Sequence, residues 1–231
     1  MRYKGGKSKV AGHFVGLIDE ALAENGGRYV EPFVGGMNVA WRLENLVSAR
    51  MSDADEDLII LYNAMLSGFI PPNTVTKEEY CALRAAKAKG PMSSFLSFGC
   101  AYGGQKWAGY ARGGGRNHVD ENARFLAKKF AGDVSPYEFA HDDYQSIPQQ
   151  DLSSVYYCDP PYRGTSGYGA AIDHDEFYEW CEGLVRLGHT VFVSEFSAPD
   201  KWEVAWSKDR KMKVGPKSVS TVTEKLYKVR A

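Results

Sequence analysis

A strand-like segment that ends in an acid and two prolines constrains this 231-residue chain more than any other feature. The run Val155-Tyr156-Tyr157-Cys158 is rich in β-branched and aromatic residues, which predicts a buried strand. Asp159-Pro160-Pro161-Tyr162 follows it, and the next seven residues contain too much glycine to continue a strand. Open α/β sheets form their ligand crevices at the carboxyl ends of strands. The sequence therefore predicts a ligand site at Asp159.

The residues of this motif favour a particular kind of ligand. The two prolines fix φ and lack an N–H, so the Asp159 carboxylate and the Pro160 carbonyl are acceptors on a stiff backbone. Tyr162 adds a flat ring. Such a set suits a planar group with an amino substituent, as in a nucleobase. An ordinary turn is the alternative reading, because Asp before Pro is common in turns.

Composition places the chain among globular proteins with one domain and room for a small insertion. Hydrophobic residues make up 44% and charged residues 25% of the chain. No apolar run approaches the roughly 18 residues of a membrane span, and the first residues lack the apolar core of a signal peptide. The four cysteines are scattered without a Cys-x-x-Cys pair, which argues against a metal site and for a cytoplasmic protein.

The net charge of −1 does not by itself favour nucleic acid, but the cations are unevenly distributed. One cluster lies between Lys106 and Lys129, and a second occupies the last stretch from Lys201 to Arg230. Local clusters of this kind can neutralise phosphates. Solvated helix faces would explain the same charges.

The first half of the chain has the rhythm of a nucleotide-binding fold. A helix ending at Asn25, a short strand from Arg28, a glycine turn and a helix from about Asn38 to Asn45 are expected in that order. A glycine turn between strand and helix lets a nucleotide-like ligand approach a sheet, although Gly-x-Gly-x-x-Gly is absent. A second strand, Ala49 to Asp53, ends in an acid at the distance where such folds bind ribose. Capping of the next helix is the alternative reading for this acidic group.

The rhythm lapses between about residues 70 and 134. Aromatic, cationic and glycine residues alternate from Tyr102 to Asn117, a mixture that suits bases and phosphates better than a dry core. A glycine-rich surface loop is the alternative. Strands from Tyr137, Val155 and Thr190, a helix from Asp173 to Leu187 and a pair of terminal strands then resume the sheet.

Taken together, these motifs resemble the Dam-type adenine-specific DNA methyltransferases, which use S-adenosylmethionine. The resemblance rests on four motifs in the family's order: Tyr3-Lys4-Gly5-Gly6-Lys7, Tyr29 to Gly36, Asp53 with the following Leu61-Tyr62-Asn63, and Asp159-Pro160-Pro161-Tyr162. It departs from the family where Met37 occupies the position of the last glycine of the cofactor loop, and its insertion matches no member closely.

The resemblance implies a Rossmann-like methyltransferase sheet with helices on both faces, formed by residues 1–69 and 135–231, and a small, mostly helical target-recognition insertion at residues 70–134. It implies double-stranded DNA as substrate, no metal, no membrane, no obligate protein partner, and a bacterial cytoplasm, with the gene carried by the cell or by a phage. The catalytic residues would be Asp159, Pro160, Pro161 and Tyr162. The cofactor would contact Tyr3, Lys7, Glu31, Phe33, Gly35, Asp53, Asp143 and Asp159. DNA would contact Lys106, Arg112, Arg116, Tyr168 and Lys217.

Two kinds of rival remain open. The same chemistry could act on cytosine or on a protein glutamine, but those enzymes usually carry Ser or Asn in place of the first acid. A DNA-binding module that has kept the fold without turnover is the second rival, and Met37 is the feature that encourages it.

Overall fold

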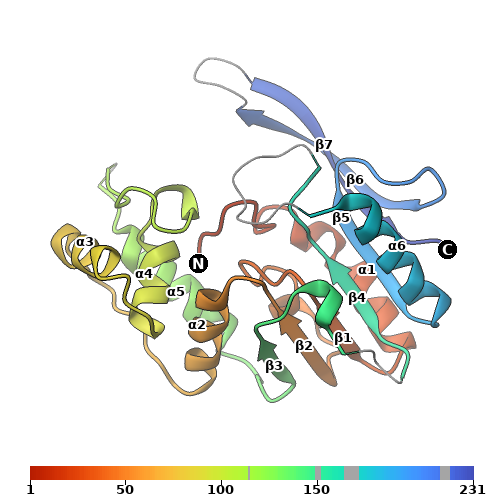
Figure 1. The fold of residues 1–231 in the computed structure, drawn as a ribbon, viewed down its shortest axis with the longest axis horizontal. Coiled ribbons are helices and arrows are strands. Elements are labelled where there is room, and N and C mark those ends of the chain that lie inside the picture. Colours follow the sequence, from red (N-terminus) through yellow and green to blue (C-terminus); the bar gives the residue numbers. More distant parts are fainter. Residues whose placement is uncertain (114, 149–151, 164–171, 214–218) are drawn as a thin grey trace.

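The computed structural model describes residues 1–113, 115–148, 152–163, 172–213 and 219–231, and its core is one seven-stranded mixed sheet (Figure 1). The strands are β1 (Arg28–Glu31), β2 (Ser48–Ser52), β3 (Tyr137–Ala140), β4 (Val155–Cys158), β5 (Thr190–Glu195), β6 (Glu203–Lys213) and β7 (Val219–Lys228). The spatial order is β3-β2-β1-β4-β5-β7-β6. The strands predicted from the sequence are all confirmed, and the two terminal ones are longer than expected.

The sheet is parallel from β3 to β5, and β7 enters antiparallel between β5 and β6. A dinucleotide-binding sheet has the order 3-2-1-4-5-6, so the extra strand β7 distinguishes this topology from it. The strand order reverses between the parallel neighbours β1 and β4: the connection after β1 leads to β2 on one side, and the connection after β4 leads to β5 on the other. Ligands in open α/β sheets bind at such a switch point.

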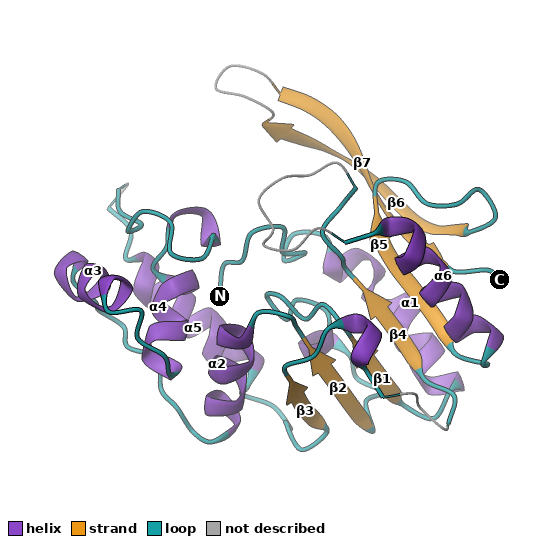
Figure 2. Ribbon diagram, in the orientation of Figure 1, coloured by secondary structure: helices purple, strands orange, loops and turns teal. Residues whose placement is uncertain are grey.

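Helices cover both faces of the sheet, as expected. The helices are α1 (Ala11–Glu24), α2 (Glu56–Leu66), α3 (Lys77–Ala85), α4 (Pro91–Gly99), α5 (His118–Lys129) and α6 (His174–Arg186), with short 3-10 helices η1 (Ala40–Arg42), η2 (Tyr102–Gly104) and η3 (Tyr144–Ser146). Figure 2 shows α6 in front of the sheet and α1 behind it.

Alternating strand residues build two hydrophobic clusters. Tyr29 and Tyr157 face the cluster that contains α1, α2, α4 and α5, whereas Val30 and Tyr156 face the cluster under α6. Burial on both faces explains why β4 reads as a continuous apolar run. No helix in the described residues is both long and apolar enough to cross a bilayer.

The prediction of a helix from Asn38 to Asn45 is wrong. Only the 3-10 turn η1 forms there, and the chain leaves it in an extended conformation at Leu43. The segment contains too few residues between the glycine turn and β2 for an amphipathic face to develop, so the buried residues Val39 and Ala40 fill the core without helical periodicity.

Residues 70–134 contain α3, α4 and α5, which lie together at one end of the sheet (Figure 1). Phe95 of α4 and Leu126 of α5 are fully buried in the same cluster as the sheet residues, so this region shares the main core. The division into a catalytic domain and a target-recognition insertion stays a prediction. At the opposite end, β6 and β7 pair along their whole described length, which confirms the expected hairpin.

Candidate active site

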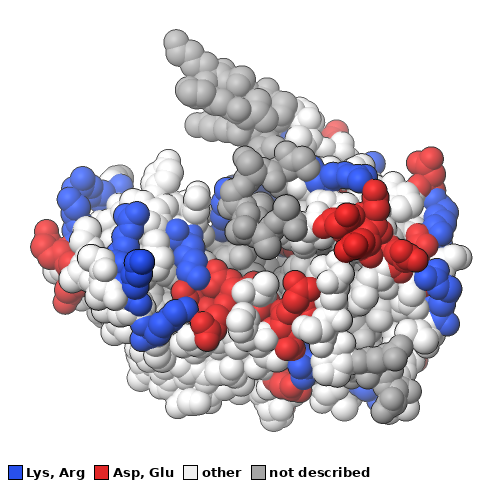
Figure 3. All heavy atoms as spheres, in the orientation of Figure 1, with Lys and Arg blue, Asp and Glu red and all other residues white. Residues whose placement is uncertain are grey.

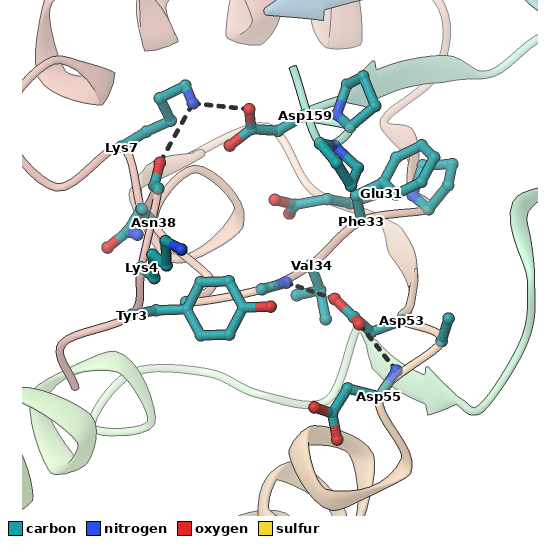
Figure 4. Close-up of a pocket in the computed structure, with 18 of the residues that line it drawn as sticks. Tyr3, Lys4, Lys7, Glu31, Phe33, Val34, Asn38, Asp53, Asp55 and Asp159 are labelled. Carbon is teal, nitrogen blue, oxygen red and sulfur yellow. Dashed lines mark hydrogen bonds and ion pairs between the residues drawn. The ribbon is translucent and has the colours of Figure 1, made fainter. Parts of the chain in front are cut away.

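One cavity of about 750 Å³ opens at the carboxyl ends of β1, β2 and β4. It brings together residues that are far apart in the sequence but were predicted to act in one site: Tyr3, Lys7, Glu31, Phe33, Gly35, Asp53, Lys106, Asp143, Asp159, Pro160, Pro161 and Tyr162. Figure 4 shows Lys7 and Asp159 at one end of the cavity and Asp53 and Asp55 at the other. The cavity therefore joins the two acidic motifs that the sequence singles out.

Asp159 leaves the end of β4 and forms an ion pair with Lys7, whose Nζ lies 2.6 Å from Oδ1. The Lys7 ammonium is almost completely buried and also donates to the Gly5 carbonyl over 3.2 Å. Burial raises the pKa of Asp159 to about 6, and Lys7 opposes that rise. Within the described residues, Oδ2 of Asp159 and the Pro160 carbonyl have no hydrogen-bond donor. Both acceptors are thus available to a ligand.

Tyr162 lies beside this ion pair. Its hydroxyl donates to Glu224 Oε1 over 2.6 Å, and its ring stands edge-to-face against Phe196 with centroids 4.5 Å apart. Lys7 Nζ lies over one ring face, 4.5 Å from the centroid. Burial, with the charges of Asp159 and Glu224, raises the pKa of Tyr162 well above its usual value, so its hydroxyl stays protonated. Glu224 belongs to β7, and nothing in its sequence context predicts this contact.

A second unpredicted acid holds the backbone after the motif. Glu195, at the end of β5, accepts from the Arg163 and Phe196 amides, each over 2.7 Å. His174, at the start of α6, lies 3.1 Å from the Pro161 carbonyl and 3.6 Å from Glu195. Burial raises the pKa of Glu195 to about 7. Its position at the end of a buried strand is the sequence feature that could have indicated a site residue.

The turn after β1 leaves room for the Tyr3 ring only because it contains glycine. A Cβ on Gly35 would lie 2.9 Å from Cε1 of Tyr3, and Gly35 also has a φ of 42°. Tyr62 of α2 fixes the turn by donating to the Gly35 carbonyl over 2.5 Å. Tyr3, Gly35 and Gly36 therefore pack into one wall of the cavity.

Met37 continues this turn with a φ of 49°, in the left-handed region that glycine adopts without strain. Its side chain is completely buried in the core. The neighbouring carbonyl of Gly36 and the side-chain oxygen of Asn38 accept from Lys129, the last residue of α5, which is itself buried. Burial lowers the pKa of Lys129 to about 7. The chain thus keeps a glycine-like turn with methionine in it.

Asp53 follows β2 and fixes two segments of the cavity wall. Its carboxylate accepts from the Gly35 amide and from the Asp55 amide, both over 2.9 Å (Figure 4). Burial raises the pKa of Asp53 to about 6, and these two hydrogen bonds oppose the rise. Asp55 separately caps α2 through the Asp57 amide. The capping role of Asp55 is confirmed, whereas binding of a ligand by Asp53 stays a prediction.

Glu31 and Phe33 lie between the two ends of the cavity. The Glu31 carboxylate is buried and accepts from the Tyr29 hydroxyl over 3.1 Å, and burial raises its pKa well above the usual value. Phe33 packs against Tyr144 and Phe177. Asp143 lines the cavity and caps η3 through the Gln145 amide.

The cations predicted to contact DNA are less available than their clustering suggests. Lys106 lies on the cavity rim and pairs with Asp55 and Asp57 over 2.6 and 2.8 Å, and Arg116 pairs with Glu121 over 2.7 Å. Arg112 is exposed and lines a separate open cavity of about 350 Å³ with Arg116. Figure 3 shows acidic side chains at the centre of this face and basic ones over the helices at its left. Tyr168 and Lys217 lie outside the described residues.

The cavity suits an elongated ligand with a nucleoside at one end. Its volume lies within the range of roughly 300–1,000 Å³ typical of small-molecule sites. Asp53 has lone pairs left for ribose hydroxyls, Phe33 offers an apolar wall, and the buried Glu31 can meet a cationic group halfway to Asp159. Among the described residues, no group of three or more His, Cys, Asp or Glu side chains could hold a metal ion. The arrangement can bind a nucleoside-type cofactor and present it to a planar amine at Asp159.

The chain is distantly similar to several proteins of known structure. No curated protein matches the chain significantly. Among solved structures, the candidate methylase HI0767 of Haemophilus influenzae has a TM-score of 0.40 at 9% identity, with 95% of this chain and 88% of that chain covered. The candidate methyltransferase yhhF of Escherichia coli has a TM-score of 0.36 at 12% identity, with 100% of this chain and 98% of that chain covered. SMU.472, a candidate methyltransferase complexed with SAH, has a TM-score of 0.35 at 14% identity, with 97% of this chain and 54% of that chain covered.

Likeness at that level carries no argument about function. The sequence of the first third of the chain says more, because it contains the N-terminal motif, the glycine turn and Asp53. Residues 3–81 match the family model of the D12 class N6 adenine-specific DNA methyltransferases, which confirms the predicted resemblance over that range.

Proposed function

We propose that this protein is a site-specific DNA methyltransferase that transfers a methyl group from S-adenosylmethionine to the exocyclic amino group of adenine in duplex DNA. One observation carries the proposal. The Asp159 carboxylate and the Pro160 carbonyl, whose Oδ2 and oxygen meet no donor among the described residues, line the same cavity as the glycine turn and Asp53, so an amine and a nucleoside cofactor can meet there. The family match over residues 3–81 supports the cofactor side of this cavity.

The acceptors at Asp159 solve the chemical difficulty of the reaction. Adenine's amino nitrogen is a poor nucleophile because its lone pair is delocalised into the ring. Oδ2 of Asp159 and the Pro160 carbonyl accept one amino hydrogen each, which localises the lone pair on nitrogen. The nitrogen forms a bond to the methyl carbon, the carbon–sulfur bond breaks with its electrons left on sulfur, and the nitrogen loses one proton. Asp159, already hydrogen-bonded to the amine, is the nearest base for that proton.

The cofactor side of the proposal assigns roles along the cavity. S-adenosylmethionine supplies an activated methyl group on a sulfonium. Asp53 binds the ribose, Phe33 and Tyr3 pack against the flat and apolar parts, and Glu31 accepts from the cofactor's amino group. Gly35 has no side chain, which lets Tyr3 and the backbone of the turn lie close together, and Asp143 makes a further polar contact with the cofactor. The sequence expectation that Lys7 meets the cofactor carboxylate remains a prediction, since its ammonium group pairs with Asp159 and Glu224.

The DNA side requires the target base to leave the helix. A base stacked inside a duplex cannot reach a cavity between sheet and loops, so it has to be flipped out. Tyr162 then stacks on the base. Lys106, Arg112 and Arg116 of residues 70–134, with Tyr168 and Lys217, are proposed to contact the DNA around it.

Methyl transfer to DNA tests the proposal directly. We expect the purified chain to transfer tritiated methyl groups from S-adenosylmethionine to unmethylated duplex DNA, and sequencing of the modified positions to locate them on adenine. Asp159→Ala should lower the rate by about a hundredfold or more while the far-UV circular dichroism stays unchanged. Glu203→Gln, which changes an exposed carboxylate on β6, is the control.

Each other result selects a rival. DNA binding without any transfer would favour a non-catalytic DNA-binding module. Label on cytosine, or on protein glutamine when protein is the acceptor offered, would reassign the substrate. Full activity in Asp159→Ala would remove this carboxylate from the mechanism.

A further inference from the structure

We propose that Glu224 of β7 is a positioning residue for methyl transfer: it orients the Tyr162 ring against the target base and keeps the Lys7 ammonium on one oxygen of Asp159. This inference rests on the proposed function and adds a residue that neither the sequence motifs nor the family match includes, since that match ends at residue 81.

The contacts of Glu224 carry the inference. One carboxylate oxygen, Oε1, accepts from the Tyr162 hydroxyl over 2.6 Å and lies 3.4 Å from Lys7 Nζ. The other, Oε2, pairs with Arg210 of β6 over 2.7 Å. Glu224 is only 3% exposed, so solvent does not compete for these partners. A single buried carboxylate thus holds the phenol and the ammonium group that flank Asp159.

The energetics of burial argue against a purely stabilising role. Lys7, Arg210, Asp159 and Glu224 form a network of two cations and two carboxylates beside the cavity. Arg210 stays partly exposed, but removing the other three charges largely from water costs free energy that mutual attraction only partly recovers, and apolar side chains of similar volume often stabilise a fold better. What the network does provide is a fixed geometry for each of its members.

Two consequences of that geometry bear on the reaction. Glu224 holds the Tyr162 hydroxyl, and Phe196 packs edge-to-face against the Tyr162 ring, so the ring has little freedom to turn away from a flipped base. Lys7 is held between Glu224 and Oδ1 of Asp159, which leaves Oδ2 for the substrate amine. If Glu224 were neutral, Asp159 would be the one anionic partner left to Lys7 among the described residues, and the ammonium group could then cover both of its oxygens.

The experiment compares the variants Glu224→Gln and Tyr162→Phe with the double variant, using the DNA substrate found by sequencing. Glu224→Gln keeps the side-chain shape, and Tyr162→Phe removes only the hydroxyl. We expect each single variant to lower kcat by roughly tenfold. The kcat of the double variant should lie within about threefold of the kcat of the slower single variant, because both changes break the same contact. The dissociation constant for S-adenosylmethionine should stay unchanged, since Glu224 lies on the acceptor side of the cavity.

The pH dependence supplies a readout that a merely structural role would not move. The negative charge of Glu224 raises the pKa of Asp159, so the acidic limb of the kcat profile should move to lower pH in Glu224→Gln. Glu203→Gln should match the wild type in both kcat and pH profile.

The outcomes separate this inference from the proposed function. A wild-type chain that transfers no methyl group overturns the proposed function. A wild-type chain that is active while Glu224→Gln keeps its kcat and acidic limb, or rate losses that multiply in the double variant, overturns the role of Glu224 alone. If Glu224→Gln does not fold, Tyr162→Phe decides: wild-type kcat in that variant refutes the inference.

Discussion

Lys7→Met should shift the acidic limb of methyl transfer to higher pH. In the folded chain the Lys7 ammonium lies 2.6 Å from Asp159, whose pKa burial has already raised to about 6. The proposed chemistry needs the ionised carboxylate, because a neutral carboxyl group is a weaker acceptor for the amino hydrogens. Methionine fills the same space without a charge, so burial of Asp159 would act unopposed by its cationic partner.

The magnitude follows from the distance. Two unit charges 2.6 Å apart attract by about 6 kcal/mol at an effective dielectric constant of about 20, and one pKa unit corresponds to about 1.4 kcal/mol. If relaxation and water recover half of that attraction, the pKa of Asp159 still rises by roughly 2 units, to a value near 8. At pH 7 the ionised fraction would fall from about nine-tenths to about one-tenth, so the rate should fall roughly tenfold and recover above about pH 9.

Single-turnover transfer of tritiated methyl, measured from about pH 5.5 to 9.5 with saturating cofactor and DNA, reads this limb without interference from product release. Lys9→Met is the matched control, since Lys9 is an exposed cation two residues along the same segment. An acidic limb that stays near pH 6 in Lys7→Met would refute the electrostatic argument. Loss of activity at every pH would show instead that Lys7 contacts a substrate directly.

Two further perturbations test Asp53 and the glycine turn that it contacts. Asp53→Asn should weaken S-adenosylmethionine binding about tenfold by calorimetry, and its thermal stability without ligand should improve relative to wild type as pH rises from 4 to 8. The pKa of Asp53 is about 6 in the folded chain and 3.8 for the ordinary group, so protonation of Asp53 stabilises the wild type fully below about pH 4, and this stabilisation is lost as pH rises through 6. Unchanged cofactor affinity, or a stability difference between variant and wild type that does not change with pH, would contradict this. Met37→Gly should be more stable in urea than Met37→Ala by about 1 kcal/mol, the reverse of the usual order, because φ is 49° there; equal or inverted stabilities would mean that the turn relaxes when methionine is removed. Both should be less stable than wild type by about 2–4 kcal/mol, since either change empties a buried side-chain volume.

The sheet could be predicted because each strand has a recognisable local pattern of residues. Val155 to Cys158 is buried on both faces and so has no polar position to blur the pattern, and the acids after β2 and β4 follow directly from strand ends. The helix expected from Asn38 failed for the opposite reason. Its apolar residues are real core residues, but the close packing of Gly35 and Gly36 against Tyr3 and the short path to β2 decide its conformation, and neither is a local property.

The parts of the site that escaped prediction come from contacts between distant segments. Glu224 meets Tyr162 across 62 residues, and Glu195 meets the Arg163 amide across 32. An acid in a terminal strand with alternating polar residues looks solvent-exposed, and only the antiparallel insertion of β7 beside β5 brings Glu224 to the cavity. The sequence indicated many of the residues that line the cavity, because ligand chemistry restricts their type. It was silent about the residues that hold them.

The cations of residues 70–134 show that a sequence pattern also fails to reveal which charges are already paired within the protein and which could bind DNA. Their clustering in sequence indicated phosphate contacts, yet Lys106 and Arg116 each have carboxylates within hydrogen-bonding distance. A phosphate that binds either one must compete with Asp55, Asp57 or Glu121, so little net positive charge is gained and few counterions are released from DNA. Arg112 is exposed and would contribute in full. Arg112→Ala should therefore reduce the salt dependence of DNA binding by close to one unit in the slope of log K against log salt, whereas Arg116→Ala should reduce it by clearly less. Equal slopes for the two variants would mean that the ion pair with Glu121 opens freely when DNA binds.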